Sequence, residues 1–145
     1  MSELTETQKA DLAALSACIV PASERYRVPG ADDPAIQADM LATMGRDAVL
    51  IQQALAQLAA LAGGPFAAVP AERRQAVAQQ LRAAGGPAVA ALTRVVLQTY
   101  YRDDRVVRSL GREPRAPFPQ GHVLEDGDWS LLDPVRARAP MWKRG

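Results

Sequence analysis

One apolar stretch decides the expected fold: residues 85–101 read GGPAVAALTRVVLQTYY. A Gly-Gly-Pro turn opens the stretch, and a helix is predicted from Ala88 onward. Its apolar and half-apolar side chains recur at helical spacing, at Val89, Leu92, Val95, Val96, Thr99 and Tyr100. This is the most apolar helical pattern in the chain, so we expect this helix to lie at the centre of a bundle.

Two helices are predicted immediately upstream of this stretch. Pro70 opens one, in which Val77 and Leu81 mark a narrow apolar stripe that stops at the Gly-Gly-Pro turn. The other is a long helix over residues 34–62, which begins with a capping aspartate and a first-turn proline. Gly45 lies inside it, so a kink or a break there is the alternative.

The first and last helices of the bundle are marked by caps. Thr5 and Gln8 form a capping-box pattern for a helix over about Glu6–Ile19, which Pro21 ends. After the central helix, Asp103 or Asp104 caps a short helix over residues 105–110. No segment alternates with period two, so strands are not expected. The pattern predicts an all-α fold, an irregular bundle of four to five helices over residues 1–111.

The last third of the chain has a different composition. Residues 112–145 hold prolines and glycines at positions that are expected to break any regular element: Pro114, Pro117, Pro119, Gly121, Gly127, Pro134 and Pro140. This extended, Pro-rich C-terminal arm is too short of apolar residues to form its own core, yet it carries Phe118, Trp129 and Trp142. The arm either packs on its own bundle, as part of the same domain, or docks on a partner chain.

Composition excludes several classes of function. The chain has 145 residues, 48% of them hydrophobic, and a formal net charge of +1, which fits one soluble globular domain. No stretch approaches the ~18 apolar residues of a membrane span, and the charge offers no field for nucleic acid or membranes. Because the N-terminus has no basic segment before an apolar run, a cytoplasmic location is expected.

The chain lacks the residues of the common catalytic and metal sites. One cysteine, Cys18, and one histidine, His122, cannot build a Cys/His zinc site or an internal disulfide. Cys18 is expected to be a small buried apolar residue, and His122 a solvated loop residue. We find no phosphate-binding glycine loop and no nucleophile elbow. No catalytic, cofactor-binding or metal-binding residue is therefore expected in this chain.

Clusters of charge have simpler interpretations than chemistry. The aspartate pairs at 32–33 and 103–104 are interpreted as helix caps, and Glu125, Asp126 and Asp128 lack the spacing of a calcium loop. Six arginines gather late in the chain, at Arg94, Arg102, Arg105, Arg108, Arg112 and Arg115. Nearby acids offset their charge, so we interpret them as a solvated face or as partner salt bridges rather than a nucleic-acid site.

Several segments together resemble one known family. Residues 15–22 (LSACIVPA) combine a helix with a proline exit, and residues 100–106 read YYRDDRV. Gly111, residues 117–121 (PFPQG) and residues 128–138 (DWSLLDPVRAR) follow in order. From about Leu12 to Arg138 the chain is similar to the gluconate 2-dehydrogenase subunit 3 family, the small subunits of FAD-dependent dehydrogenases of the glucose-methanol-choline type.

The resemblance implies a non-catalytic, accessory and chaperone-like role. A member of this family would bind a large catalytic subunit, which carries the FAD, and would help it fold while that subunit oxidises an alcohol, a sugar or a related hydroxyl substrate. Such subunits often carry a twin-arginine export signal, which is not visible here. The expected location is the cytoplasm, with the periplasm, reached by co-export with a partner, as the alternative.

The expected partner-binding residues follow from the arm and its root. Phe118, Trp129 and Trp142 are predicted apolar anchors, and Arg136 and Arg138 are predicted charged contacts. Tyr100 and Tyr101 are predicted to pack at the hinge of the arm, with ordinary core positions as the alternative. Two other classes of function stay open: a free-standing helical domain that binds a small hydrophobic ligand, and an enzyme that depends on His122 or Cys18.

Overall fold

The computed structural model describes residues 4–115, 121 and 126–139, and the chain divides into two units, Met1–Pro114 and Arg115–Gly145. All regular secondary structure among the described residues is helical, with α-helices α1 to α7 and three short 3-10 helices, η1 to η3. The one β-type contact described there is an isolated antiparallel bridge between Ser23 and Val28. The prediction of an all-α fold is confirmed.

The first helix, α1 (Glu6–Ile19), follows its sequence signals closely. The Thr5 hydroxyl accepts a hydrogen bond from the Gln8 backbone N–H, and the Gln8 side chain accepts one from the Thr5 backbone N–H. The helix ends one residue before Val20, whose extended backbone leads into Pro21.

The predicted long helix over residues 34–62 is wrong, because the chain breaks at Gly45. The structure has α2 (Pro34–Thr43), the 3-10 turn η1 (Gly45–Asp47) and then α3 (Ala48–Ala62). Glycine is a poor helix former, and Asp47 beside it is held from outside the helix by Arg94, with 2.7 Å between Arg94 Nη2 and Asp47 Oδ1. The break raises the α-helix count in residues 4–115 to six, above the four to five expected.

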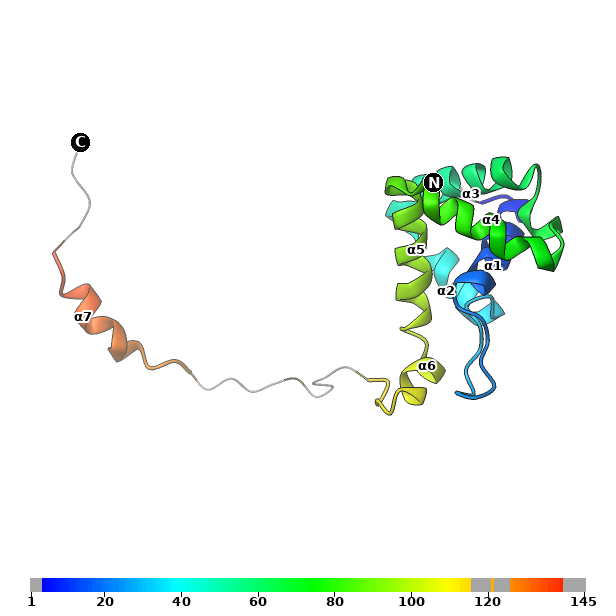
Figure 1. Cartoon of the computed structure of the whole chain (residues 1–145). Coiled ribbons are helices and arrows are strands. Elements are labelled where there is room, and N and C mark those ends of the chain that lie inside the picture. Colours follow the sequence, from blue (N-terminus) through cyan, green and yellow to red (C-terminus); the bar gives the residue numbers. More distant parts are fainter. Residues whose placement is uncertain (1–3, 116–120, 122–125, 140–145) are drawn as a thin grey trace, which may run out of the picture. The chain divides into compact units, whose positions relative to one another are not determined.

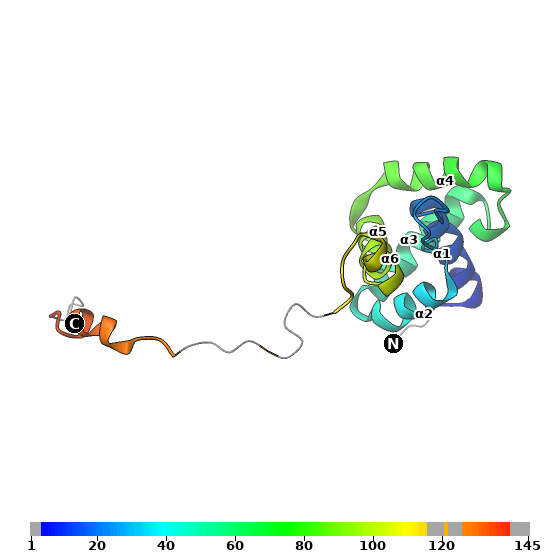
Figure 2. The same ribbon diagram turned by 90° about the horizontal axis from the view of Figure 1, so that it is seen from below.

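Helix α5 (Gly86–Tyr100) lies against several others in the first unit. It follows α4 (Ala71–Ala84) across a turn at Gly85, and it packs mainly on α3 and on α2. Figure 1 shows α5 running from the turn after α4 toward α6 (Asp104–Ser109), and Figure 2 shows the same helices from below. The predicted central position agrees with its eight buried residues.

A short turn that no periodic pattern marks completes the core. The 3-10 helix η2 (Phe66–Ala68) lies against α1 and α3, and its Phe66 side chain has 0% exposure. The backbone N–H of Ala67 donates to the carboxylate of Asp11 in α1, at 2.8 Å. Asp11 is itself only 3% exposed, so a buried carboxylate fastens η2 to α1.

One segment of the first unit has the length and composition of a membrane span. Residues 45–68 contain an 18-residue window with mean hydropathy 1.3, so the statement that no stretch approaches such a span is wrong. In the structure this segment comprises η1, α3 and η2, and 28% of that window is buried. Ile51, Leu55 and Leu58 of α3 are 0–1% exposed and belong to the core of the unit.

Replacing Ser16 by alanine is expected to stabilise the protein by about 1 kcal/mol, because a buried hydroxyl without a partner carries a desolvation cost. Ser16 is 0% exposed, and its Oγ has no hydrogen-bond partner among the described residues. Urea unfolding measures the change. The matched control is Ser109→Ala, which removes a hydroxyl that donates to the Val106 carbonyl at 2.7 Å and should destabilise. A loss of stability in Ser16→Ala would contradict the prediction.

The sequence predicted no regular structure in the second unit. The described part of this unit nevertheless contains some. It contains η3 (Trp129–Leu132) and a single helical turn, α7 (Asp133–Arg136). Pro134 fits because a proline in the first turn of a helix lacks only an N–H that has no helical partner there. Pro134 was expected to break regular structure, but it lies in the first turn of α7.

Candidate functional site

The η3–α7 segment, defined as residues 128–136, exposes most of its apolar side chains. Trp129 is 69% exposed, Leu131 73%, Leu132 40% and Val135 56%. None of the described residues from 126 to 139 is buried. Four large apolar side chains within seven positions form an unusual surface for a protein in water, and such surfaces mark binding sites.

Local hydrogen bonds order the turn that carries Trp129. The Asp128 carboxylate accepts bonds from the Ser130 hydroxyl at 2.6 Å and from the Ser130 backbone N–H at 3.0 Å. These two bonds hold the pKa of Asp128 below its usual range, the hydroxyl bond most strongly. Trp129 is therefore the first residue of a helical turn that Asp128 caps.

The other predicted residues of the arm have separate outcomes. Arg136 forms an exposed ion pair with Asp133, at 3.3 Å between Nη1 and Oδ1, which contributes little to stability. Arg138 is exposed, and its backbone N–H donates to the Val135 carbonyl. Phe118 and Trp142 lie outside the described residues. Partner binding by all of these residues stays a prediction.

Tyr100 and Tyr101 have different environments at the end of α5. Tyr100 is 4% exposed and occupies a core position, where its hydroxyl donates to the Pro29 carbonyl at 3.2 Å. Burial, with smaller effects of Tyr101 and Asp103, raises its pKa. Tyr101 is 54% exposed and meets Tyr100 edge to face, at 5.2 Å between ring centroids. Tyr100 thus anchors the loop after α1, which lies at the same end of the unit as α6 in Figure 1.

Four of the six clustered arginines pair with acids of this same chain, and their side chains are 44–60% exposed. Their interpretation as a solvated face agrees with this exposure, and salt bridges to a partner stay a prediction. Arg102 donates to Asp39 at 2.6 Å and to the Thr43 hydroxyl at 2.9 Å. Arg94 pairs with Asp47, as described above. Arg105 pairs with both Asp33 and Asp103, and Arg108 pairs with Asp104. The pairs of Arg94 with Asp47, Arg102 with Asp39 and Arg105 with Asp33 join α5 and α6 to η1 and α2.

The interpretation of the paired aspartates as caps is confirmed for two residues. Asp33 accepts the backbone N–H groups of Ala35 and Ile36 at the start of α2, and Asp103 accepts that of Arg105 at the start of α6. Arg105 bridges the two caps. Its hydrogen bonds are the main reason that the pKa values of Asp33 and Asp103 lie below the usual range.

Arg105→Gln is expected to lower stability by about 1 kcal/mol or less at neutral pH, since the Arg105 side chain is 44% exposed. A lowered folded-state pKa means that the contribution is complete above the ordinary aspartate pKa of 3.8 and is lost as pH falls through the lowered values. The urea stabilities of variant and wild type should therefore converge between about pH 4 and pH 2. Arg108→Gln, whose ion pair is 60% and 63% exposed, is the control with no measurable difference. A constant difference across that range would contradict the assignment.

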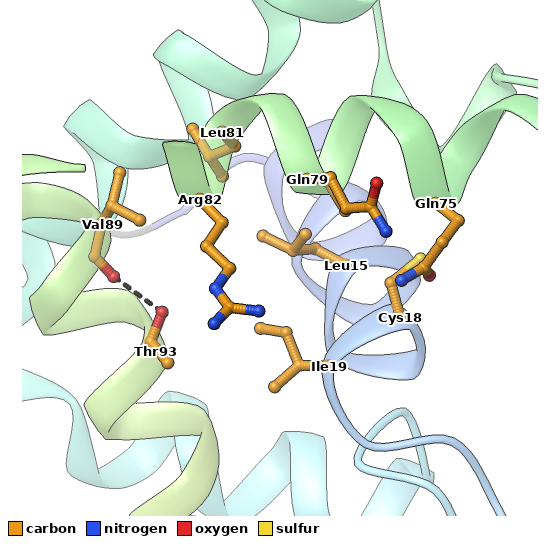
Figure 3. A pocket seen from close by; sticks show the side chains of 10 residues that line it. Leu15, Cys18, Ile19, Gln75, Gln79, Leu81, Arg82, Val89 and Thr93 are labelled. Carbon is orange, nitrogen blue, oxygen red and sulfur yellow. Dashed lines mark hydrogen bonds between the residues drawn. The ribbon is translucent and has the colours of Figure 1, made fainter. Parts of the chain in front are cut away.

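A cleft of about 470 Å³ opens between α1, α4 and α5. Its apolar lining comprises Leu15, Ile19, Ala78, Leu81 and Val89. Figure 3 shows Gln75, Gln79 and Arg82 of α4 directed over the cleft, with Thr93 of α5 opposite. This volume lies within the ~300–1,000 Å³ of small-molecule sites.

Cys18 lines this cleft and is not fully buried, which corrects its expected place in the core. Its burial still raises the pKa of the thiol, while Arg74 lowers it slightly, so the thiolate is scarce at neutral pH. His122, the other residue of the hypothetical catalytic pair, lies outside the described residues. Within the described ranges, no three His, Cys, Asp or Glu side chains gather as a metal ion would need.

Two residues that organise the first unit, Phe66 and Asp11, were not predicted from the sequence. Phe66 follows a Gly-Gly-Pro turn in a short segment between two helices, so no sustained helical pattern includes it. Asp11 interrupts an apolar pattern in α1, and such an interruption is the one signal that could have suggested a buried polar contact.

Comparison of the chain with family models, curated proteins and solved structures finds no match.

Proposed function

We propose that this chain is the non-catalytic small subunit of a heteromeric FAD-dependent dehydrogenase, and that the η3–α7 segment docks on the large catalytic subunit. The observation that carries the proposal is the exposure of Trp129, Leu131, Leu132 and Val135 in a segment with no buried residue. The proposal that the partner binds FAD and oxidises a hydroxyl substrate rests on the sequence resemblance.

The energetic reason is the apolar area that this segment leaves in water. A tryptophan side chain buries ~150–250 Å² when it enters a pocket, and each Å² of apolar surface contributes ~25 cal/mol. Trp129 alone therefore offers several kcal/mol, of which part is lost to the ordering of the segment. The capped turn at Asp128 lowers that ordering cost because it already fixes the backbone around the ring.

Docking would stabilise the large subunit by mass action. A chain that binds only the folded form of its partner lowers the unfolded population, by ~2.7 kcal/mol at a hundredfold excess over Kd. The Pro-rich residues after Arg112 would act as an extended arm for this purpose. We place the complex in the cytoplasm, with the periplasm, reached by co-export, as the alternative.

The test is purification of the tagged full-length chain from cells that make it at native level. We expect a larger chain to co-purify with the visible absorption of a flavin, and we expect that chain to be less soluble when it is expressed alone. Recovery of this chain as a monomer, with no flavin-bearing companion in any preparation, would overturn the proposal. A reading frame beside its gene that opens with a dinucleotide-binding glycine motif is the matching genomic expectation.

The cleft between α1, α4 and α5 favours a second candidate, a helical domain that binds a small hydrophobic ligand without a partner. This alternative predicts that the monomer is self-sufficient and retains an apolar ligand through purification. Native mass spectrometry separates the two, since the first predicts a protein partner and the second a small mass added to the monomer.

A further inference from the structure

The polar groups around the cleft select a class of ligand. Gln75, Gln79 and Arg82 stand on one side of α4, at spacings of four and three residues, which places them in a row along the helix. Within the described part of the chain, none of these three side chains has a hydrogen bond or an ion pair. All three are exposed residues at the edge of the cleft, so their donor groups are available to a ligand.

Arg74 of the same helix gives the contrast. Its guanidinium donates to the Val69 carbonyl at 2.8 Å and to the Ala67 carbonyl at 2.6 Å, so it is committed to holding η2. Arg82 has no such role. In Figure 3 its side chain extends from α4 into the space between Ile19 of α1 and Thr93 of α5.

We propose that the α1–α4–α5 cleft binds a monocarboxylate with a hydrocarbon chain. The chain lies on Leu15, Ile19, Leu81 and Val89, and the carboxylate accepts from Arg82, with the amides of Gln75 and Gln79 beside it. A single guanidinium matches a single carboxylate in charge, and its planar donors match the two oxygens in geometry. The inference gives the ligand class of the second candidate function, and it holds equally for a chain that also docks on a large subunit.

The chain contains its own reporter for this site. Cys18 is the only cysteine, and it lines the cleft, so a bound ligand should shield it from a thiol reagent. The measurement is the rate at which uncharged iodoacetamide alkylates the full-length protein, followed by mass, at a fixed mildly alkaline pH. An uncharged reagent avoids attraction to Arg82.

We expect octanoate to slow alkylation by about tenfold at saturation. Acetate should have no effect, and octan-1-ol should protect only at concentrations about tenfold higher, since it lacks the charge. Arg82→Gln should raise the octanoate concentration for half-protection by about tenfold, and Arg82→Lys by about threefold at most. Arg73→Gln, on the same helix but outside the cleft, should behave as wild type.

Three outcomes would overturn the inference. Octanoate could leave the rate unchanged, it could protect Arg82→Gln as well as wild type, or octan-1-ol could match it. Faster alkylation with octanoate would show unfolding by a surfactant and would also count against the site. All of these measurements use this chain alone, so their failure is independent of the fate of the partner proposal.

Discussion

Trp129→Ala is expected to weaken binding to the flavin-bearing subunit by at least 2 kcal/mol, or roughly thirtyfold in Kd, because a tryptophan that fills a pocket is the commonest type of interface hot spot. The ring is 69% exposed and belongs to the second unit, and it is not among the buried core residues of the first unit. Far-UV circular dichroism and the urea midpoint of the isolated variant should therefore match wild type. Binding is measured by titration of the two purified subunits.

Two further variants serve as controls for this experiment. Trp129→Phe retains part of the apolar area and should lose less affinity than Trp129→Ala. Tyr26→Ala removes an aromatic ring of similar exposure, 62%, from the loop after α1, and should bind like wild type. If Trp129→Ala instead loses its cooperative unfolding transition while the complex survives, the ring belongs to the protein's own fold and the docking proposal is wrong.

The helices were predictable because each is bounded by local chemistry that needs no tertiary contact. The capping box at Thr5, the caps at Asp33 and Asp103 and the turn glycines all act within a few residues, so the sequence alone locates the ends. Helices η3 and α7 were not predicted, and the break at Gly45 was predicted only as the alternative to one long helix. There the apolar pattern continues through the glycine, and periodicity alone does not distinguish one long helix from two helices in line.

The contacts between distant segments could not be predicted in the same way. Arg102 meets Asp39 and Arg105 meets Asp33 across some sixty to seventy residues, with no spacing rule that relates them. The row of arginines was visible, yet its partners depend on how α2 lies beside α5 and α6. The cleft is a similar case, since α1, α4 and α5 each supply a few residues and no single helix shows a pattern for a ligand.

The candidate docking residues of the η3–α7 segment were predictable from the sequence only in part. An aromatic ring in a segment rich in proline indicates burial against some surface, and Trp129 is 69% exposed within its own unit. The capped turn beneath the ring was not predicted. It arises from the short pair Asp128 and Ser130, which the proline-rich context obscured.

Phe66→Ala is expected to destabilise the protein by about 3–5 kcal/mol, the largest effect of any single substitution proposed for stability. Phe66 has 0% exposure and stands first among the fully buried side chains by volume, so its truncation leaves a cavity between η2, α1 and α3. Such a loss is a large fraction of the ~5–15 kcal/mol that stabilises a typical domain. Urea unfolding measures the change, and a free energy within 1 kcal/mol of wild type would contradict the assigned core.

The controls for Phe66→Ala separate a cavity from a general loss of apolar surface. Leu110→Ala removes a side chain that is 59% exposed and should change stability by ~0.5 kcal/mol or less. Asp11→Ala removes the acceptor of the Ala67 N–H, leaves that donor buried, and should cost about 2 kcal/mol. Because Asp11 and Phe66 hold the same turn, their double variant should lose less than the two single losses added together, since a turn already released by one change has less to lose from the other. Strict additivity would mean that η2 stays in place without either contact.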